Sequence, residues 1–172
     1  MTFRLLALSA VVLAAGCSQS ATDEAAPEAM VDNVCTGMPK SGNATFEIVP
    51  GLQARVLENG YGRAAMPGDY AEVHYTGWLY DESASDLRGA KFDSSVDRDQ
   101  AFQFMLGEGR VIKGWDKGVE CMLIGEKREL TIAPEMGYGD RGAGGVIPPG
   151  ATLLFEVELR NLQGPTDDAA AN

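Results

Sequence analysis

Hydrophobic and polar residues alternate in several short runs between residues 44 and 163. In the clearest run, Leu153, Phe155, Val157 and Leu159 alternate with mostly polar neighbours, and weaker runs occur at 46–48, 52–56 and 127–132. This alternation is typical of β-strands that turn one face to a core and the other to water. Two further strands are expected at 70–80, which is long enough to cross the sheet, and at 102–106. The polar segment 81–90 indicates a surface loop or bulge. Together these runs predict an antiparallel sheet of about five strands.

One segment, 111–119, has helical periodicity instead. Ile112, Trp115 and Val119 recur at spacings of three and four residues and form one apolar face. Two glycines lie inside this segment, and each costs about 1 kcal/mol relative to alanine, so the helix depends on tertiary packing. A single short helix packed on an antiparallel sheet predicts an α+β fold.

The first residues have the character of a targeting segment. Arg4 precedes an apolar run, 5–15, that is too short to span a membrane. The junction LAAGC at 13–17 resembles a bacterial lipoprotein signal, which implies that residues 1–16 are removed and that Cys17 is lipidated. The alternative is an ordinary signal peptide in which this cysteine is incidental.

The resemblance implies a domain held in the bacterial cell envelope by a lipid anchor. A serine directly after the lipidated cysteine, as Ser18 is here, is similar to the pattern of lipoproteins sent to the outer membrane. The domain would then face the periplasm. Which leaflet of the membrane holds the anchor is left open. The segment 17–43 is rich in small, acidic and proline residues and predicts a flexible tether, and 164–172 predicts a disordered tail. The folded domain is therefore expected at 44–163.

Length and charge limit the function further. A chain of 172 residues with 45% hydrophobic composition suffices for one core, so we expect one domain with tails. We also expect the protein to be a monomer. The net charge of -11 argues against nucleic acid as a partner, because phosphate binding needs clustered lysine and arginine.

Two cysteines, Cys35 and Cys121, remain after removal of the signal. In an oxidising compartment such a pair favours a disulfide. The alternative is that Cys121 is a small core residue and Cys35 a free thiol.

The usual catalytic sets are absent from the sequence pattern. The single histidine, His74, lies within a predicted strand and reads as structural, and no serine has the setting of a nucleophile elbow. No cluster has metal-ligand spacing, so we expect no metal site. The glycine-rich segment 137–145 lacks the lysine and hydroxyl residue that end a phosphate-binding loop.

The chain is instead rich in aromatic residues within the predicted domain. These residues either form the core or line a half-open pocket, and a pocket suits tyrosine and tryptophan better because their polar atoms need partners. The set comprises Tyr75, Phe92, Phe102, Phe104, Trp115, Tyr138 and Phe155, of which Phe104 is assigned to the core.

Several motifs occur in a fixed order along 70–162. They are VHYTG at 73–77, KFDSS at 91–95, FQFMLG at 102–107, VIKGW at 111–115, GYG at 137–139, IPP at 147–149 and ATLLF at 151–155. Taken together, they make this stretch resemble the FKBP-type peptidyl-prolyl cis-trans isomerases. The resemblance implies an antiparallel half-barrel sheet wrapped around one short helix, and no cofactor.

The resemblance also implies roles for individual residues. The catalytic set would be Tyr75, Asp93, Ile112 and Tyr138, with the peptide N–H of Ile112 and the hydroxyl of Tyr138 as donors to substrate carbonyls. Arg98 would pair with Asp93. Trp115 would form the pocket floor, and the other substrate-binding residues would be Phe92, Phe102, Val111, Ile147 and Phe155.

The implied substrates are proline-containing unfolded or extended polypeptides, and the macrolides tacrolimus and rapamycin are expected to compete with them. Rotation about an X-Pro bond breaks no covalent bond, so it requires neither nucleophile nor metal. The alternative is a proline-segment-binding chaperone or assembly lipoprotein with little isomerase activity. The sequence departs from compact family members in the longer segment 78–90, and at Val96 and Ala143.

Overall fold

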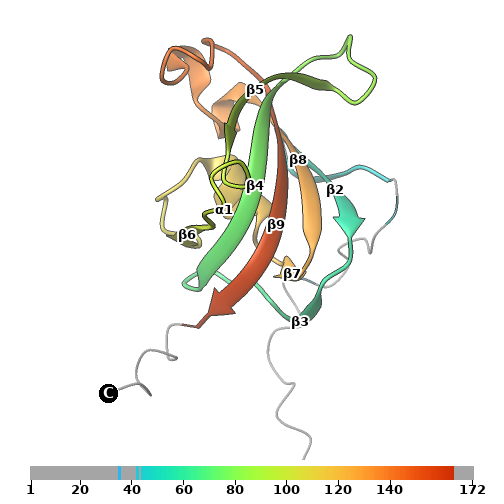
Figure 1. Cartoon of the computed structure of the whole chain (residues 1–172), viewed down its shortest axis with the longest axis vertical. Coiled ribbons are helices and arrows are strands. Elements are labelled where there is room, and N and C mark those ends of the chain that lie inside the picture. Colours follow the sequence, from blue (N-terminus) through green and yellow to red (C-terminus); the bar gives the residue numbers. More distant parts are fainter. Residues whose placement is uncertain (1–34, 36–41, 43, 165–172) are drawn as a thin grey trace, which may run out of the picture.

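The two longest strands, β4 (Tyr70–Tyr80) and β9 (Leu153–Gln163), run antiparallel through the centre of one twisted sheet (Figure 1). This computed structural model describes residues 35, 42 and 44–164. The sheet order is β1-β2-β8-β9-β4-β5, and β6 also pairs with β4. The remaining strands are β1 (Phe46–Val49), β2 (Leu52–Glu58), β5 (Arg88–Ser94), β6 (Phe102–Met105) and β8 (Lys127–Ile132).

Shorter elements complete the described part. Strands β3 (Tyr61–Ala64) and β7 (Leu123–Ile124) form a separate two-stranded sheet. Two 3-10 helices, η1 (Pro134–Met136) and η2 (Gly139–Arg141), lie between β8 and β9. The α+β class, with an antiparallel sheet around one short helix, is confirmed. The main sheet has seven strands in the described ranges rather than about five.

The predicted loop at 81–90 is wrong at its last three positions. Strand β5 begins at Arg88, which pairs with Tyr80 of β4, so only 81–87 form the connection. The guanidinium of Arg88 lies 4.3 Å from the centre of the Trp78 ring. The beginning of β5 has no buried face. Its residues therefore show no alternation of hydrophobic and polar positions, and the sequence pattern does not predict a strand there.

Strands β5 and β6 share one edge of β4, since β9 occupies the other edge. Ser95 fills the junction between them: its Oγ accepts a hydrogen bond from the peptide N–H of Tyr75 at 2.8 Å, and its own N–H donates to the carbonyl of Tyr75 at 3.0 Å. Nδ1 of His74 lies 3.1 Å from the same Oγ. His74 therefore serves the structure, and Tyr75 is fixed at the point where the edge opens.

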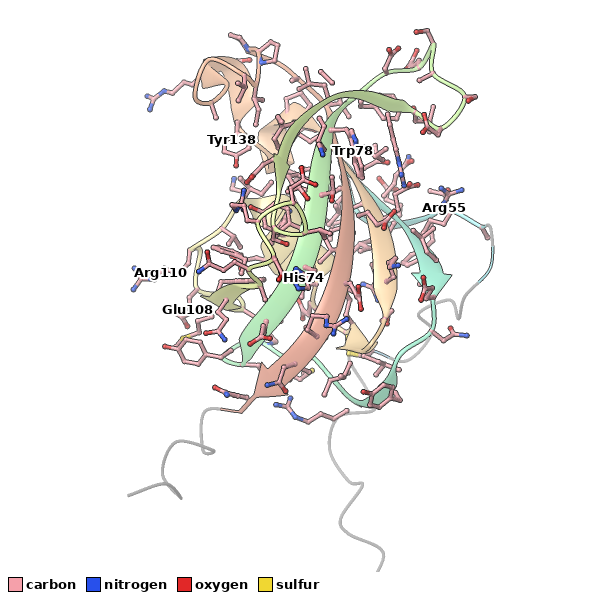
Figure 2. All side chains as sticks on the ribbon, viewed as in Figure 1. Arg55, His74, Trp78, Glu108, Arg110 and Tyr138 are labelled. Carbon is pink, nitrogen blue, oxygen red and sulfur yellow. A yellow bond between two sulfur atoms is a disulfide. The ribbon has the colours of Figure 1, made fainter. Side chains whose placement is uncertain are left out.

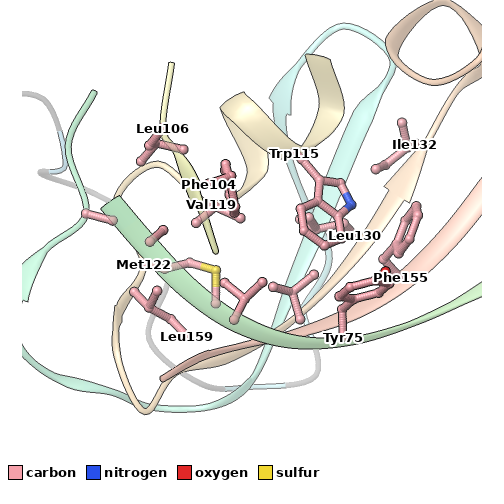
Figure 3. Close-up of a cluster of buried hydrophobic side chains, with 14 of the residues drawn as sticks. Tyr75, Phe104, Leu106, Trp115, Val119, Met122, Leu130, Ile132, Phe155 and Leu159 are labelled. Carbon is pink, nitrogen blue, oxygen red and sulfur yellow. The ribbon is translucent and has the colours of Figure 1, made fainter. Parts of the chain in front are cut away.

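Helix α1 (Lys113–Gly118) packs against the concave side of the sheet (Figures 1 and 3). It is shorter than the predicted segment, with Ile112 as N-cap and Val119 as C-cap. A Cβ added at Gly114 would lie 2.6 Å from Cγ2 of Ile132. Glycine is required here because it lets the helix backbone approach β8 this closely.

A buried ion pair closes the far end of α1. Arg128 is 1% exposed, and its Nε donates to Oε1 of Glu126 at 2.8 Å. Its Nη1 donates to the carbonyl of Gly118 at 2.8 Å, which satisfies a terminal acceptor of the helix. Burial lowers the pKa of Arg128, against the opposing charge of Glu126.

A disulfide joins Cys35 to Cys121, with Cα atoms 5.4 Å apart. Cys121 lies three residues beyond the last residue of α1 and has a left-handed backbone conformation, with φ of 66°. Of the two alternatives left by the sequence, the structure therefore contains the bridge, which ties residue 35 to the C-terminal end of the helix.

The signal segment 1–16, Cys17, most of the tether and residues 165–172 lie outside the described residues, so lipidation and these boundaries stay predictions. No helix in the described ranges combines the length and apolar character needed to cross a membrane.

Candidate active site

A cavity of about 380 Å³ opens beside the N-terminal end of α1. Its volume lies within the range of small-ligand pockets. Its lining comes from β4, β5, β6, β9, the segment before α1, the helix itself and the residue before η2. The lining residues are Tyr75, Phe92, Asp93, Phe102, Arg110, Val111, Ile112, Trp115, Tyr138 and Phe155.

Trp115 forms the centre of an aromatic cluster in this cavity. Its ring meets Tyr75 edge-on with centroids 4.9 Å apart, and Phe155 edge-on at 5.3 Å. Phe102 is a third edge-on neighbour, at 6.0 Å. Figure 3 shows Tyr75 and Phe155 beside the indole, which comes from α1. Edge-to-face packing fixes each ring against the others, so the cavity has a rigid apolar floor.

One carboxylate, that of Asp93, lies at this aromatic wall. Its Oδ2 accepts a hydrogen bond from the hydroxyl of Tyr75 at 2.5 Å, and its Oδ1 accepts one from the N–H of Ser94 at 2.8 Å and forms an ion pair with Arg98. Burial by itself would raise the pKa of Asp93, but the hydrogen bonds from Tyr75 and Arg98 hold it below its usual value. Asp93 is therefore a fixed, ionised group.

The hydroxyl of Tyr75 is fully engaged by this network. It donates to Asp93 and accepts a hydrogen bond from Nη2 of Arg98 at 3.1 Å. Burial, followed by the hydrogen bond to Asp93, raises the pKa of Tyr75. A phenol in this state is not free to donate to a substrate, so Tyr75 acts through its ring and by positioning Asp93.

Two other donors at the cavity are unused by the described part of the chain. Neither the peptide N–H of Ile112 nor the hydroxyl of Tyr138 makes a hydrogen bond with a described residue. Burial, and then the charge of Asp93, raises the pKa of Tyr138, so its hydroxyl stays protonated. Figure 2 shows Tyr138 below the orange segment that connects β8 to β9. The pair can donate to two carbonyls of a bound peptide.

The segment leading to Ile112 is held by Asp116 of α1. Its Oδ1 accepts from the N–H of Gly107 at 3.0 Å, and its Oδ2 accepts from the N–H of Gly109 at 2.9 Å. Both glycines have positive φ, 81° and 65°. One carboxylate thus fixes the turn that places Val111 and Ile112 at the cavity.

A model of the FKBP-type peptidyl-prolyl cis-trans isomerases matches residues 61–160 of this chain. The chain belongs to this family. Both the family resemblance and the enzyme class predicted from the sequence are thereby confirmed.

Relatives of this FKBP-type isomerase occur in bacteria and fungi. An FK506-binding protein of Neisseria meningitidis serogroup A is 58% identical over 103 residues, covering 60% of this chain and 88% of that protein. FK506-binding protein 2B of Rhizopus delemar is 46% identical over 130 residues, covering 76% of this chain and 59% of that protein.

The crystal structure of FkpA from Escherichia coli is similar in fold, with a TM-score of 0.62 and 35% sequence identity. The similarity covers 72% of this chain and 54% of the FkpA chain. This FKBP-type chain therefore spans little more than half the length of FkpA and of the Rhizopus relative.

The structure brings almost all predicted site residues of this FKBP-type chain to the cavity. Ile147 is the exception: it does not line the cavity, although it is 6% exposed and belongs to the buried cluster that also contains Trp115 and Phe155. Its backbone forms a short bridge with Ala143, in which the N–H of each residue donates to the carbonyl of the other at 3.0 Å.

The sequence reasoning missed Arg110 and Asp116. Arg110 lines the cavity, and Asp116 holds the turn before it. The only sequence signal was position: Arg110 directly precedes Val111, and Asp116 directly follows Trp115. The longer segment 78–90 supplies no lining residue.

Proposed function

We propose that this chain catalyses cis–trans rotation about X-Pro bonds in unfolded or extended polypeptides of the bacterial envelope, with the proline ring held above Trp115. The observation that carries the proposal is the rigid aromatic cavity with two unused hydrogen-bond donors at its wall.

The cavity favours the twisted state of the peptide bond. A planar amide has more charge separation than a twisted one, and its resonance creates a barrier of about 18–20 kcal/mol. The apolar cavity floor solvates the polar, planar amide less well than water does. The twisted amide is less polar, so it loses less solvation free energy on entering the cavity. Binding that is stronger in the twisted state lowers the barrier, and each ~1.4 kcal/mol gives a tenfold rate gain.

The donors add orientation. Ile112 N–H and the Tyr138 hydroxyl would hold the carbonyls next to the proline, so that only one amide is free to rotate. Asp93 contributes a fixed negative charge beside that amide, because Tyr75 and Arg98 keep it ionised and in place.

Macrolides of the tacrolimus and rapamycin type are expected to occupy the same cavity. Two relatives are named for binding FK506, and the cavity is large enough for part of such a ligand. Rapamycin should change the fluorescence of Trp115 in a Trp78→Phe variant, which lacks the other tryptophan. An unchanged spectrum together with an unchanged Tm at micromolar rapamycin would refute this expectation.

The site is tested directly by a protease-free isomerisation assay on a prolyl peptide. Tyr138→Phe should lower kcat/KM about fivefold, because one hydrogen bond contributes about 1 kcal/mol. Asp93→Ala should lower kcat/KM as well. Tyr61→Phe is the matched control, since Tyr61 is 68% exposed and does not line the cavity. A folded wild-type chain without activity would contradict the proposal.

The chaperone alternative finds less support. A holding protein of this family type is expected to carry an inserted domain before the last strand, whereas Tyr138 to Pro149 contains only η2 and one bridge between Ala143 and Ile147. Suppression of client aggregation by an inactive chain would favour the chaperone.

Anchoring at Cys17, attachment to the outer membrane facing the periplasm, and the monomeric state complete the proposal. The signal-like residues 1–17 support the first two. Cys17→Ser should release the protein from membranes in cell fractionation, and light scattering of the soluble domain should give a monomer mass.

A further inference from the structure

Most lysine and arginine side chains in the described part of the chain form ion pairs. Arg110, Lys113 and Arg141 form none with a described residue. In a chain with a net charge of -11, unpaired cations are an exception that invites an explanation. Only Arg110 among these three lines the cavity.

Hydrogen bonds hold the backbone just before Arg110 in place, while its side chain forms no ion pair with a described residue. Arg110 directly precedes Val111 and Ile112, and the turn before it is fixed by the two hydrogen bonds to Asp116. The side chain is exposed, so it can meet a bound peptide without losing an existing partner. Figure 2 shows Arg110 beside Glu108 on the side of the molecule that carries β6.

We propose that Arg110 is a specificity-determining residue that makes this isomerase prefer substrates with an aspartate or glutamate next to the proline. The inference rests on the proposed isomerase function and names its substrate class. A planar guanidinium can donate two parallel hydrogen bonds to a carboxylate, which suits this role.

The other charged residues near the cavity either disfavour an acidic substrate or are already paired. Asp93 is paired with Arg98, whereas Glu108 and Asp140 lie close in sequence to lining residues and form no ion pair. These acids and the overall negative charge would favour a cationic substrate. Control by Arg110 thus predicts a preference for acidic substrates, whereas control by the surrounding acids predicts a preference for cationic ones.

Short-range contact decides the sign under physiological conditions. At about 0.15 M ionic strength the Debye length is about 8 Å, so distant charges of the chain are screened more than a guanidinium in contact with substrate. Exposed charge pairs change binding about two- to fivefold, and this is the expected preference for glutamate over glutamine.

The experiment compares kcat/KM for peptides that differ only in having Glu, Gln or Lys directly before or directly after the proline. The wild-type chain, Arg110→Gln, Arg110→Lys and Lys113→Gln are measured at about 0.15 M and about 1 M salt. Lys113→Gln is the matched control, because it removes the same charge from an exposed neighbour that does not line the cavity.

We expect a Glu/Gln ratio of about two to five for the wild-type chain at one of the two positions. The ratio should fall to about one in Arg110→Gln and at high salt, should partly return in Arg110→Lys, and should persist in Lys113→Gln. Ratios remove any change in absolute rate that the substitution itself causes.

Three outcomes would overturn the proposal: a ratio of one or less at both positions, a ratio unchanged by Arg110→Gln, or an equal loss in Lys113→Gln. Failure to isomerise even the glutamine peptides would instead refute the proposed function. The two failures are thus distinguishable.

Discussion

Replacing Gly114 by alanine should destabilise the protein even though alanine is the better helix former. A Cβ at this position would lie 2.6 Å from Cγ2, 2.8 Å from Cδ1 and 3.0 Å from Cγ1 of Ile132. Carbon atoms in favourable contact lie about 3.5–4.0 Å apart, so α1 would have to move away from β8 by roughly 1 Å. Overpacking of this kind costs about 1–3 kcal/mol.

Helix propensity offsets part of that cost. Alanine is favoured over glycine in a helix by up to about 1 kcal/mol. Subtracting this gain leaves an expected net loss of about 0–2 kcal/mol in the free energy of unfolding, measured by urea denaturation. Activity should fall too, because Trp115 is the next residue along the chain and a 1 Å misplacement costs up to about a hundredfold in rate. A tenfold loss of kcat/KM is expected.

A double-mutant cycle separates the clash from other effects. Ile132→Ala removes all three contacting atoms, so Gly114→Ala in that background should be neutral or stabilising. A coupling energy of at least about 1 kcal/mol between the two positions is expected. If Gly114→Ala alone stabilises the protein, or if the coupling is near zero, the close approach of α1 to β8 does not explain the glycine.

The remaining predictions concern the carboxylates and the disulfide. Because the pKa of Asp93 is held below its usual value, kcat/KM should stay constant as the pH falls from about 7 to about 4. The stability that ionised Asp93 contributes is fully present above its unfolded-state pKa. That stability is lost only as the pH falls through the lower folded-state pKa. Asp116→Asn should lower kcat/KM about fivefold with a small change in Tm, because one of two backbone N–H groups loses its carboxylate acceptor. The double variant Cys35→Ser, Cys121→Ser removes the disulfide that joins residues 86 positions apart. In the chain-entropy model its loss should lower the free energy of unfolding by about 4–5 kcal/mol.

Each of these has its own check. A rate loss centred near pH 5–6 that disappears in Asp93→Asn would contradict the assigned pKa direction. For Asp116→Asn, the amide exchange rate of Gly107 or of Gly109 should rise, and unchanged rates at both would refute the role of Asp116. For the cysteines, guanidinium denaturation gives the stability, and a loss below about 1 kcal/mol would show that the bridge does not stabilise this fold.

The sequence predicted the strands, the helix and the aromatic residues that show a local periodicity or a recognisable motif. The strand at 153–159 follows from the alternation of Leu153, Phe155, Val157 and Leu159, all of which are buried. The strand at 70–80 follows from the length of the segment. The helix around Trp115 follows from its apolar stripe, although its glycines become intelligible only beside Ile132 and Leu130. The aromatic residues of the cavity were recognisable because their order along the chain matches a family.

Features without a local signal were lost or left open. The start of β5 at Arg88 lacks a buried face, and the pairing of Cys35 with Cys121 depends on two segments meeting across 86 residues. Ile147 matched a pocket motif, but in the structure it is buried and does not line the cavity.

The amino-acid sequence thus determined the kind of fold, the family and most of the residues that line the cavity, since these depend on periodicity and motif order. The tertiary structure decided what each group is free to do. It engages the hydroxyl of Tyr75 with Asp93, leaves that of Tyr138 without a hydrogen bond to the described residues, and brings the unpaired Arg110 to the cavity. Such partnerships depend on distances between segments far apart in the chain, which no local pattern records.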